Sequence, residues 1–243
     1  MVRVVERSDV GAGVWTITLA RPERRNAVDH ATLLALIEAQ RALVDARVIV
    51  LSGAPPAFCA GADLTGVEEA AFNTTLAQVL HGFAGMAAPV IAAIDGPALG
   101  AGAQLAAVCD LRVATSESIV GVPAARLGLV IDQWTIERLR TEFGAATTRG
   151  MLLAAETYTG ERLYACGAVH RLGTVDDALE WAGRIALLAP LSVAAHKVGL
   201  DPDPTTEHRD RFEELRSAAW SSDDAREGRA AFLEKRRSAF HGR

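Results

Sequence analysis

Two short turns of small residues carry the best candidates for chemistry in this chain of 243 residues. The first spans residues 57–64 and follows an apolar run at 48–51, and the second spans 96–105. Small residues let the backbone come close to a ligand, and a turn that opens a helix leaves backbone N–H groups without partners. We predict that each turn offers one N–H group and that the pair stabilises a negative oxygen. Gln104, in the second turn, can donate and accept hydrogen bonds but cannot act as an acid or base near pH 7.

Two further segments accompany these turns. Residues 21–27 read Arg-Pro-Glu-Arg-Arg-Asn-Ala, and residues 222–236 form a charged stretch that ends in Phe-Leu-Glu-Lys-Arg. In this order the four segments resemble the crotonase (enoyl-CoA hydratase/isomerase) superfamily over nearly the whole chain. The resemblance implies a coenzyme A thioester as ligand or substrate, with no separate cofactor. It also implies that an oxyanion hole is formed by the backbone N–H groups of Ala62 and Ala101.

The chain departs from the family pattern where hydratase chemistry is carried out. The resemblance places the two hydratase glutamates at Gln104 and at Ala124, which follows a Gly-Val-Pro turn. Adding water across a conjugated double bond needs one group to activate the water and another to deliver a proton, each contributing about 100- to 10,000-fold. The chain is therefore identified as a member that lacks both hydratase glutamates, and we predict that hydration is weak or absent.

Asp132 is the remaining candidate for a catalytic carboxylate. Dienoyl-CoA isomerases of the same superfamily carry an aspartate at a similar place, where it could transfer one proton. Asp132 also precedes a helical-looking stretch at 133–143, and aspartate is a favoured N-cap. The neighbouring Trp134 replaces the small residues of hydratases, so it is expected either to line the acyl pocket and restrict water or to be a packed aromatic.

The phosphates of coenzyme A require cations. Arg24 and Arg25 are the best local candidates, because the planar guanidinium suits bidentate contact with phosphate. By motif position the resemblance places three further residues near the adenine or pantetheine: Ala60, Asp63 and Leu64. A second basic cluster, at residues 235–237, is either part of the coenzyme A site or a solvated surface.

Three functions remain open from these residues. The first is an acyl-CoA-binding protein of fatty-acid or lipid metabolism, which carries or presents its ligand to a protein partner without hydrating it. The second is an enzyme of the family that uses another base, such as Asp132, for an enolate-type isomerisation. The third is a scaffold whose pocket is vestigial.

The elements that position these residues indicate the α/β class, because strands, turns and helices alternate along the chain. The resemblance refines this to a crotonase-like spiral of repeated ββα units with a C-terminal helical trimerisation region. We expect a core with the acyl-CoA site at 1–190 and helices for oligomerisation, with part of the coenzyme A site, at 191–243. A homotrimer or a dimer of trimers is implied. The predicted strands are 2–6, 14–19, 48–51, 90–94, 111–114 and 119–120, and the predicted helices include 31–43, 68–86, 133–143, 159–166, 176–188, 206–220 and one from Gln104 onward.

The amino-acid composition limits the classes of function that fit this chain. Half of the residues are hydrophobic and the formal net charge is −5, which is typical of a globular chain and disfavours broad binding of nucleic acid. Neither the three cysteines nor the six histidines show metal-ligand spacing, so we predict no metal. The N-terminus lacks a secretory signal pattern, and no apolar run reaches the roughly 18 residues of a membrane helix, so a cytoplasmic location is expected.

Overall fold

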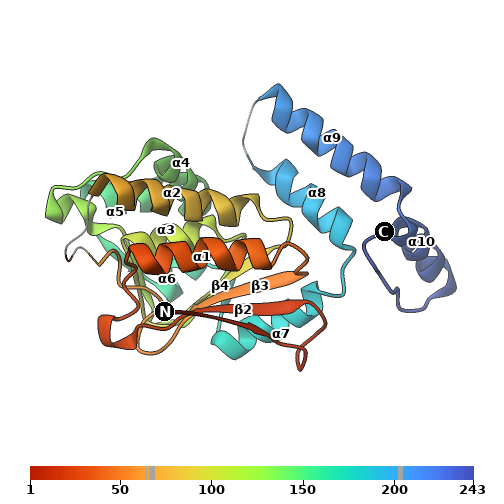
Figure 1. Ribbon diagram of the computed structural model, residues 1–243, viewed down its shortest axis with the longest axis horizontal. Helices are drawn as coiled ribbons and strands as arrows, with labels where there is room; N and C mark the ends of the chain where they lie inside the picture. The colour runs from red at the N-terminus through yellow and green to blue at the C-terminus, as the bar shows by residue number, and fades with distance from the viewer. Residues whose placement is uncertain (64, 66–68, 202–204) are drawn as a thin grey trace.

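A six-stranded sheet forms the centre of the computed structural model, which describes residues 1–63, 65, 69–201 and 205–243 (Figure 1). Its strand order is β1-β2-β3-β4-β6-β9, with β1 antiparallel to β2 and every other pair parallel. The parallel strands β3 and β4 are buried on both faces, which explains their continuous apolar sequences. The bounds are β1 Val2–Glu6, β2 Val14–Leu19, β3 Val48–Gly53, β4 Val90–Ile94, β6 Leu111–Ala114 and β9 Arg171–Leu172.

A second sheet runs beside the first and has the order β5-β7-β8, with bounds Pro97–Leu99, Ile119–Gly121 and Thr157–Thr159. Successive repeats contribute one strand to each sheet: β4 is followed by β5, and β6 by β7. Cys59 forms a parallel bridge with Ala98, which in turn pairs with Val120. Three successive turns of the chain are therefore aligned side by side. This arrangement confirms the predicted α/β spiral.

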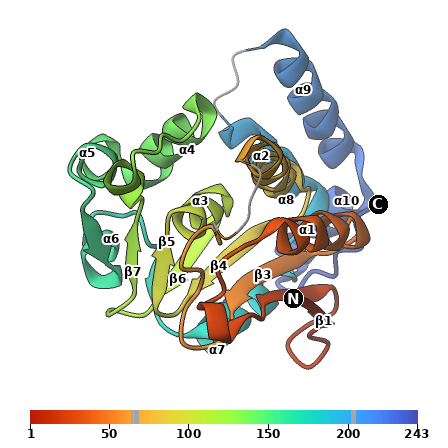
Figure 2. The same cartoon turned by 60° about the vertical axis from the view of Figure 1, so that its left-hand side comes forward.

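Helices cover both faces of the large sheet (Figures 1 and 2). On one face lie α1 (His30–Ala42), α2 (Glu69–Gly85) and α3 (Ala101–Val108), and on the other lies α7 (Val175–Ile185). Alternation along β3 sends Ile49 and Leu51 into the core beneath α1–α3, and Val48 and Val50 into the core beneath α7. The predicted helix from Gln104 begins one turn earlier, at Ala101.

The second half of the chain is mainly helical. Its elements are α4 (Gln133–Phe143), α5 (Ala145–Leu153), α6 (Gly160–Ala165), α8 (Pro190–Leu200), α9 (Thr206–Ser221) and α10 (Asp223–Glu234), and two 3-10 helices lie earlier, η1 (Pro22–Arg24) and η2 (Pro123–Leu127). The expected boundary near residue 190 coincides with the start of α8. However, α8 is anchored to the core, because Lys197 Nζ donates to Asp110 Oδ2 at 2.8 Å and to the Phe83 carbonyl at 3.2 Å. Helices α9 and α10 lie farther from the sheet than α8 does (Figure 1).

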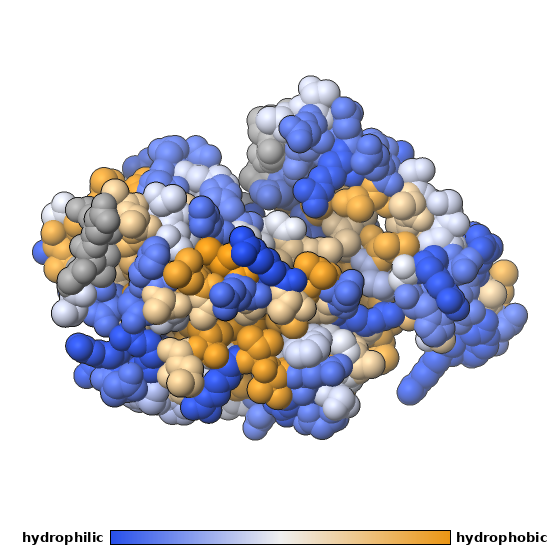
Figure 3. Space-filling model, viewed as in Figure 1, coloured by the Kyte–Doolittle hydropathy of each residue, from blue (hydrophilic) through white to orange (hydrophobic). Residues whose placement is uncertain are grey.

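The surface is mixed in polarity. In Figure 3 hydrophilic residues cover much of α9, while apolar residues gather over the middle of the face that is drawn. Within the described ranges, no single helix is long and apolar enough to cross a membrane; α7 and α8 reach that length only together, across a bend of 113°.

Candidate functional site

The two small-residue turns lie side by side because they occupy neighbouring positions in the spiral. The Cys59 N–H donates to the Pro97 carbonyl at 3.0 Å, and the Leu99 N–H donates back to Cys59 at 2.9 Å. Past these bonds, a Cβ on Gly100 would lie 3.7 Å from the Cα of Gly61. Gly100 has a φ of +54°, which favours glycine. The two turns therefore approach at their glycines.

Each turn presents a backbone N–H group with no acceptor among the described residues. Around Ala62 the neighbouring groups are paired: Val28 N–H donates to the Gly61 carbonyl at 2.9 Å, and Asp63 N–H donates to Val28 at 2.8 Å, while the Ala62 N–H makes no such bond. Ala101 is the first residue of α3, so its N–H lies outside the helical ladder. Two backbone donors of this kind can stabilise an oxygen that gains negative charge.

Both donors belong to residues that line one cavity of about 420 Å³. Its described lining contains no aspartate, glutamate, histidine, cysteine, lysine, arginine or tyrosine, and its only polar side chains are those of Asn73 and Gln104. The lining residues are Ala60, Gly61, Ala62, Phe72, Asn73, Leu76, Leu99, Gly100, Ala101, Gln104, Val122, Pro123, Ala124, Leu127, Leu129, Val130 and Ile131.

Gln104 is the buried polar group of this cavity. The residue is 6 % exposed, and its side-chain amide makes no hydrogen bond with any residue that the structure describes. It lies one turn after Ala101 on the same side of α3, as residues three apart on a helix do. Ala124, on η2, lines the cavity as well. The structure thus brings Gln104 and Ala124, the two positions singled out by the resemblance, together with the two free N–H groups.

Asp132 and Trp134 lie outside this described lining. Asp132 is the N-cap of α4: its carboxylate accepts from the Thr135 N–H at 2.9 Å and from the Thr135 hydroxyl at 2.7 Å. This cap directs Trp134 toward α2, where its ring stacks on His81 with the ring centroids 3.9 Å apart. Trp134 thus packs against α2, and the aliphatic residues of the 129–131 segment line the cavity.

A second cavity of about 480 Å³ lies on the other side of that segment. The two cavities share the walls formed by Ala124 and residues 129–131. The second is otherwise enclosed by α4 and α5, and it is mostly apolar. No sequence pattern indicates this cavity, because it depends on how α5 packs against η2.

Basic residues lie next to the first cavity at η1. The Ala60 N–H donates to the Arg25 carbonyl at 3.0 Å, which attaches η1 to the cavity wall. The exposed side chains of Arg24 and Arg25 form no ion pair with a described residue. The Asp63 carboxylate, in contrast, is engaged: hydrogen bonds from Thr65 and Arg21 hold its pKa below the ordinary value. The expected contact at Leu64 lies outside the described residues.

The C-terminal basic cluster does not border this cavity within one chain. Helix α10 lies at the opposite end of the molecule from α5 (Figures 1 and 2). Arg236 is also paired, donating to both oxygens of Glu227 at 2.6 and 2.8 Å. Arg236, together with the Ala239 N–H, lowers the pKa of Glu227 to about 2. A contribution from α10 to the site would have to come from another subunit.

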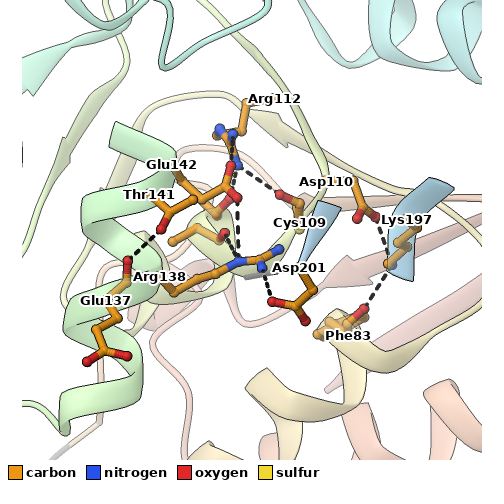
Figure 4. Close-up of polar contacts among 12 residues, drawn as sticks. Phe83, Cys109, Asp110, Arg112, Glu137, Arg138, Thr141, Glu142, Lys197 and Asp201 are labelled. Carbon is orange, nitrogen blue, oxygen red and sulfur yellow. Dashed lines mark hydrogen bonds and ion pairs between the residues drawn. The ribbon is translucent and has the colours of Figure 1, made fainter. Parts of the chain in front are cut away.

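Two arginines hold the far end of α3 (Figure 4). Arg112, which is 2 % exposed, donates to the carbonyls of Cys109 at 2.8 Å and Ala106 at 3.2 Å, and to Glu142 at 2.5 Å. Arg138 donates to the Ala107 carbonyl at 3.3 Å. These carbonyls are the ones that a helix leaves unpaired at its C-terminus. The arginines thereby fix the helix whose first N–H faces the cavity.

The cysteines offer no nucleophile near the cavity. Complete burial raises the pKa of Cys59 and of Cys109 to about 12, so both stay as thiols. Among the described residues, no group of three or more histidines, cysteines or acidic residues is placed to hold a metal ion.

Comparison with known proteins gives consistent matches over almost the full length. Residues 9–243 match the family described as Enoyl-CoA hydratase/isomerase. A relative from Mycobacterium tuberculosis (strain CDC 1551 / Oshkosh), named "Probable enoyl-CoA hydratase echA6", is 42 % identical over 233 residues, which cover 94 % of this chain and 96 % of that one. The 2,3-dehydroadipyl-CoA hydratase of Escherichia coli (strain K12) is 32 % identical, with coverage of 95 % and 96 %. Among solved structures, an enoyl-CoA hydratase from Mycobacterium smegmatis superposes with a TM-score of 0.87 at 29 % identity, covering 99 % of this chain and 98 % of that one.

Proposed function

The chain belongs to the enoyl-CoA hydratase/isomerase family, and within it we propose that this protein binds acyl-CoA thioesters of fatty-acid metabolism without hydrating them. The observation that carries the proposal is the set of residues that line the first cavity. It keeps two free backbone donors, but its described lining has no side chain that can take or give a proton.

The thioester carbonyl would lie between the N–H groups of Ala62 and Ala101, which act as an oxyanion hole. Each such donor contributes about 3–4 kcal/mol toward a developing oxyanion. With carbonyl polarisation alone, no group activates water and none delivers a proton. At the position of one glutamate Gln104 offers only an amide, and at the other Ala124 offers a methyl group. The ligand is then held without being hydrated.

The contacts proposed for the rest of the ligand follow from the residues that surround the thioester carbonyl. The guanidinium groups of Arg24 and Arg25 would contact the phosphates, with Ala60 and Asp63 beside the adenine or pantetheine. The acyl chain would pass along the 129–131 segment toward the second cavity. Burial of each methylene contributes about 0.8 kcal/mol, so the chain supplies much of the affinity.

The same proposal includes an oligomeric state and a cellular role for the protein. Exposed apolar side chains on the C-terminal helices, among them Trp220 and Phe232, support a homotrimer or a dimer of trimers formed through that region. A non-hydrating binder would carry acyl-CoA in the cytoplasm to a protein partner of lipid metabolism. The alternative, an isomerase using Asp132, has less support, because both oxygens of that carboxylate accept hydrogen bonds from Thr135.

Calorimetric titration tests the proposal. The purified protein is titrated with dodecanoyl-CoA, with trans-2-dodecenoyl-CoA and with free coenzyme A. We expect both thioesters to bind more tightly than free coenzyme A and the recovered enoyl thioester to be unchanged. Absence of binding to either thioester would refute the proposal.

A further inference from the structure

Two arginines of the second cavity are unpaired within the described part of the chain. Arg140 on α4 and Arg149 on α5 both line this cavity, and both residues are exposed. Neither side chain forms a hydrogen bond or an ion pair with a residue that the structure describes. The described lining contains no aspartate or glutamate, so the two guanidinium groups give the cavity a net positive charge.

A buried hydroxyl group belongs to the same lining. Thr148 directly precedes Arg149 on α5 and lines the second cavity. The residue is 4 % exposed, and its Oγ1 atom makes no hydrogen bond with the described residues. A buried polar group without a partner is unfavourable, so a ligand that accepts a hydrogen bond from this hydroxyl would gain affinity.

A carboxylate on an aliphatic chain matches this set of side chains. Its two oxygens accept paired hydrogen bonds from a planar guanidinium, and the remaining lone pairs accept from a hydroxyl group. Apart from Arg140, Thr148 and Arg149, the described lining consists of alanine, leucine, isoleucine and valine. The cavity therefore suits a ligand whose body is a hydrocarbon and whose end is an anion.

The wall between the two cavities indicates which end of an acyl-CoA would meet the arginines. This wall consists of Ala124 and residues 129–131, none of which is charged. Both arginines lie beyond it, on helices α4 and α5, which pack against each other. A chain whose thioester is held by Ala62 and Ala101 would pass the uncharged wall first and reach the arginines with its far end.

We propose that the protein selects acyl-CoA thioesters whose chain ends in a carboxylate, and that Arg140, Thr148 and Arg149 bind this terminal group. The inference rests on the proposed binding of acyl-CoA at the first cavity. The three side chains act by hydrogen bonding and charge alone, so no bond is made or broken in the ligand.

Thioesters matched in length test this selectivity. Calorimetry measures the affinities of octanoyl-CoA, dodecanoyl-CoA and hexadecanoyl-CoA, and of the three thioesters of equal length that carry a terminal carboxylate. We expect the parent protein to bind the carboxylated thioester at least about fivefold more tightly at one or more of these lengths. Without cations at the far end, the carboxylate would instead weaken binding, because it loses water on entering an apolar cavity.

Variants assign the preference to the three side chains. The double variant Arg140→Gln, Arg149→Gln is expected to abolish it while binding the thioesters without a carboxylate like the parent. Thr148→Val keeps the shape of the side chain, removes the hydroxyl group and is expected to reduce the preference. The control Arg3→Gln, Arg41→Gln removes the same charge at exposed positions outside both described linings, and it should keep the preference.

The outcomes separate this inference from the binding proposal. Equal affinities at all three lengths in the parent protein would overturn the inference and leave the binding proposal intact. A preference that persists in the Arg140, Arg149 double variant would overturn it as well. So would an equal loss in the control, which would show attraction by overall charge rather than a site. Failure of every thioester to bind the parent protein would overturn both proposals together.

Discussion

The carbonyl oxygen of Cys59 occupies the space that a side chain at Gly102 would need. A Cβ at Gly102 would lie well under 3.0 Å from that oxygen, a separation that real Cβ atoms essentially never show. Cys59 lies in the turn that carries the Ala62 N–H, and Gly102 directly follows Ala101. The spacing of the two proposed donors therefore depends in part on this close approach between backbones, beside the hydrogen bonds that join the two turns.

Replacing Gly102 by alanine should push the two turns apart. We expect a loss of stability of about 1–3 kcal/mol from overpacking and at least tenfold weaker binding of an acyl-CoA, measured by denaturant titration and calorimetry. Gly85→Ala is the matched control, because no atom lies within 4 Å of a Cβ built there. Normal thioester binding by Gly102→Ala would show that the two turns do not act together.

Filling the second cavity should shorten the acyl chain that the protein accepts. Ala145 is exposed and lines this cavity, whereas the adjacent Ala146 is exposed but is not among the described lining residues. Ala145→Trp is expected to weaken hexadecanoyl-CoA at least tenfold, since each excluded methylene costs about 0.8 kcal/mol, and to leave hexanoyl-CoA unchanged. Ala146→Trp should bind both ligands like the parent. An equal effect of the two variants on hexadecanoyl-CoA would exclude this route for the chain.

Introducing carboxylates at residues 104 and 124 should produce hydration. The double variant Gln104→Glu, Ala124→Glu places an acid–base pair at the cavity that contains the free N–H groups. We expect hydration of trans-2-butenoyl-CoA at least about 100-fold above the parent, followed by loss of the enoyl absorbance. The single variant Gln104→Glu is the control for a change of charge alone. No gain in the double variant would mean that the missing glutamates are not what prevents hydration.

His170 should make the folded state sensitive to acid. Burial, together with the nearby Arg112, lowers its pKa from an ordinary value of 6.5 to about 4. Between these values the unfolded chain binds a proton that the folded chain does not, so stability falls as the pH falls from about 6.5 to 4 and is constant above that window with respect to this group. Urea midpoints at several pH values should fall less steeply for His170→Gln than for the parent. Identical slopes for the two proteins would contradict the assignment of this pH dependence to His170.

Sequence alone predicted the parts of the fold that depend on local patterns. The α/β spiral and the apolar strands appear as expected, and residues 62, 101, 104 and 124 meet at one cavity. Strands β5, β8 and β9 were not predicted, because they are two or three residues long and are fixed by pairing with distant neighbours. Helix α5 and the cavity beneath it were likewise not predicted, because they depend on tertiary packing.

Side-chain direction and burial were harder to predict. Trp134 was expected either to line the acyl pocket or to be a packed aromatic, and its contact with His81 depends on how α4, capped by Asp132, packs against α2. Arginine is usually found at the surface, yet Arg112 is buried and donates hydrogen bonds to carbonyls of α3 and of Ala168. No local signal distinguishes such an arginine from an exposed one, because its partners lie far apart in the sequence.

The most direct test of the central claim is incubation of the purified protein with trans-2-dodecenoyl-CoA in deuterated water, followed by mass spectrometry of the thioester. We expect an unchanged thioester, together with binding shown by titration of the same sample. A product heavier by one molecule of heavy water would demonstrate hydration and contradict the role assigned to Gln104 and Ala124. Deuterium uptake without added water would also contradict it and would make Asp132 the leading candidate base.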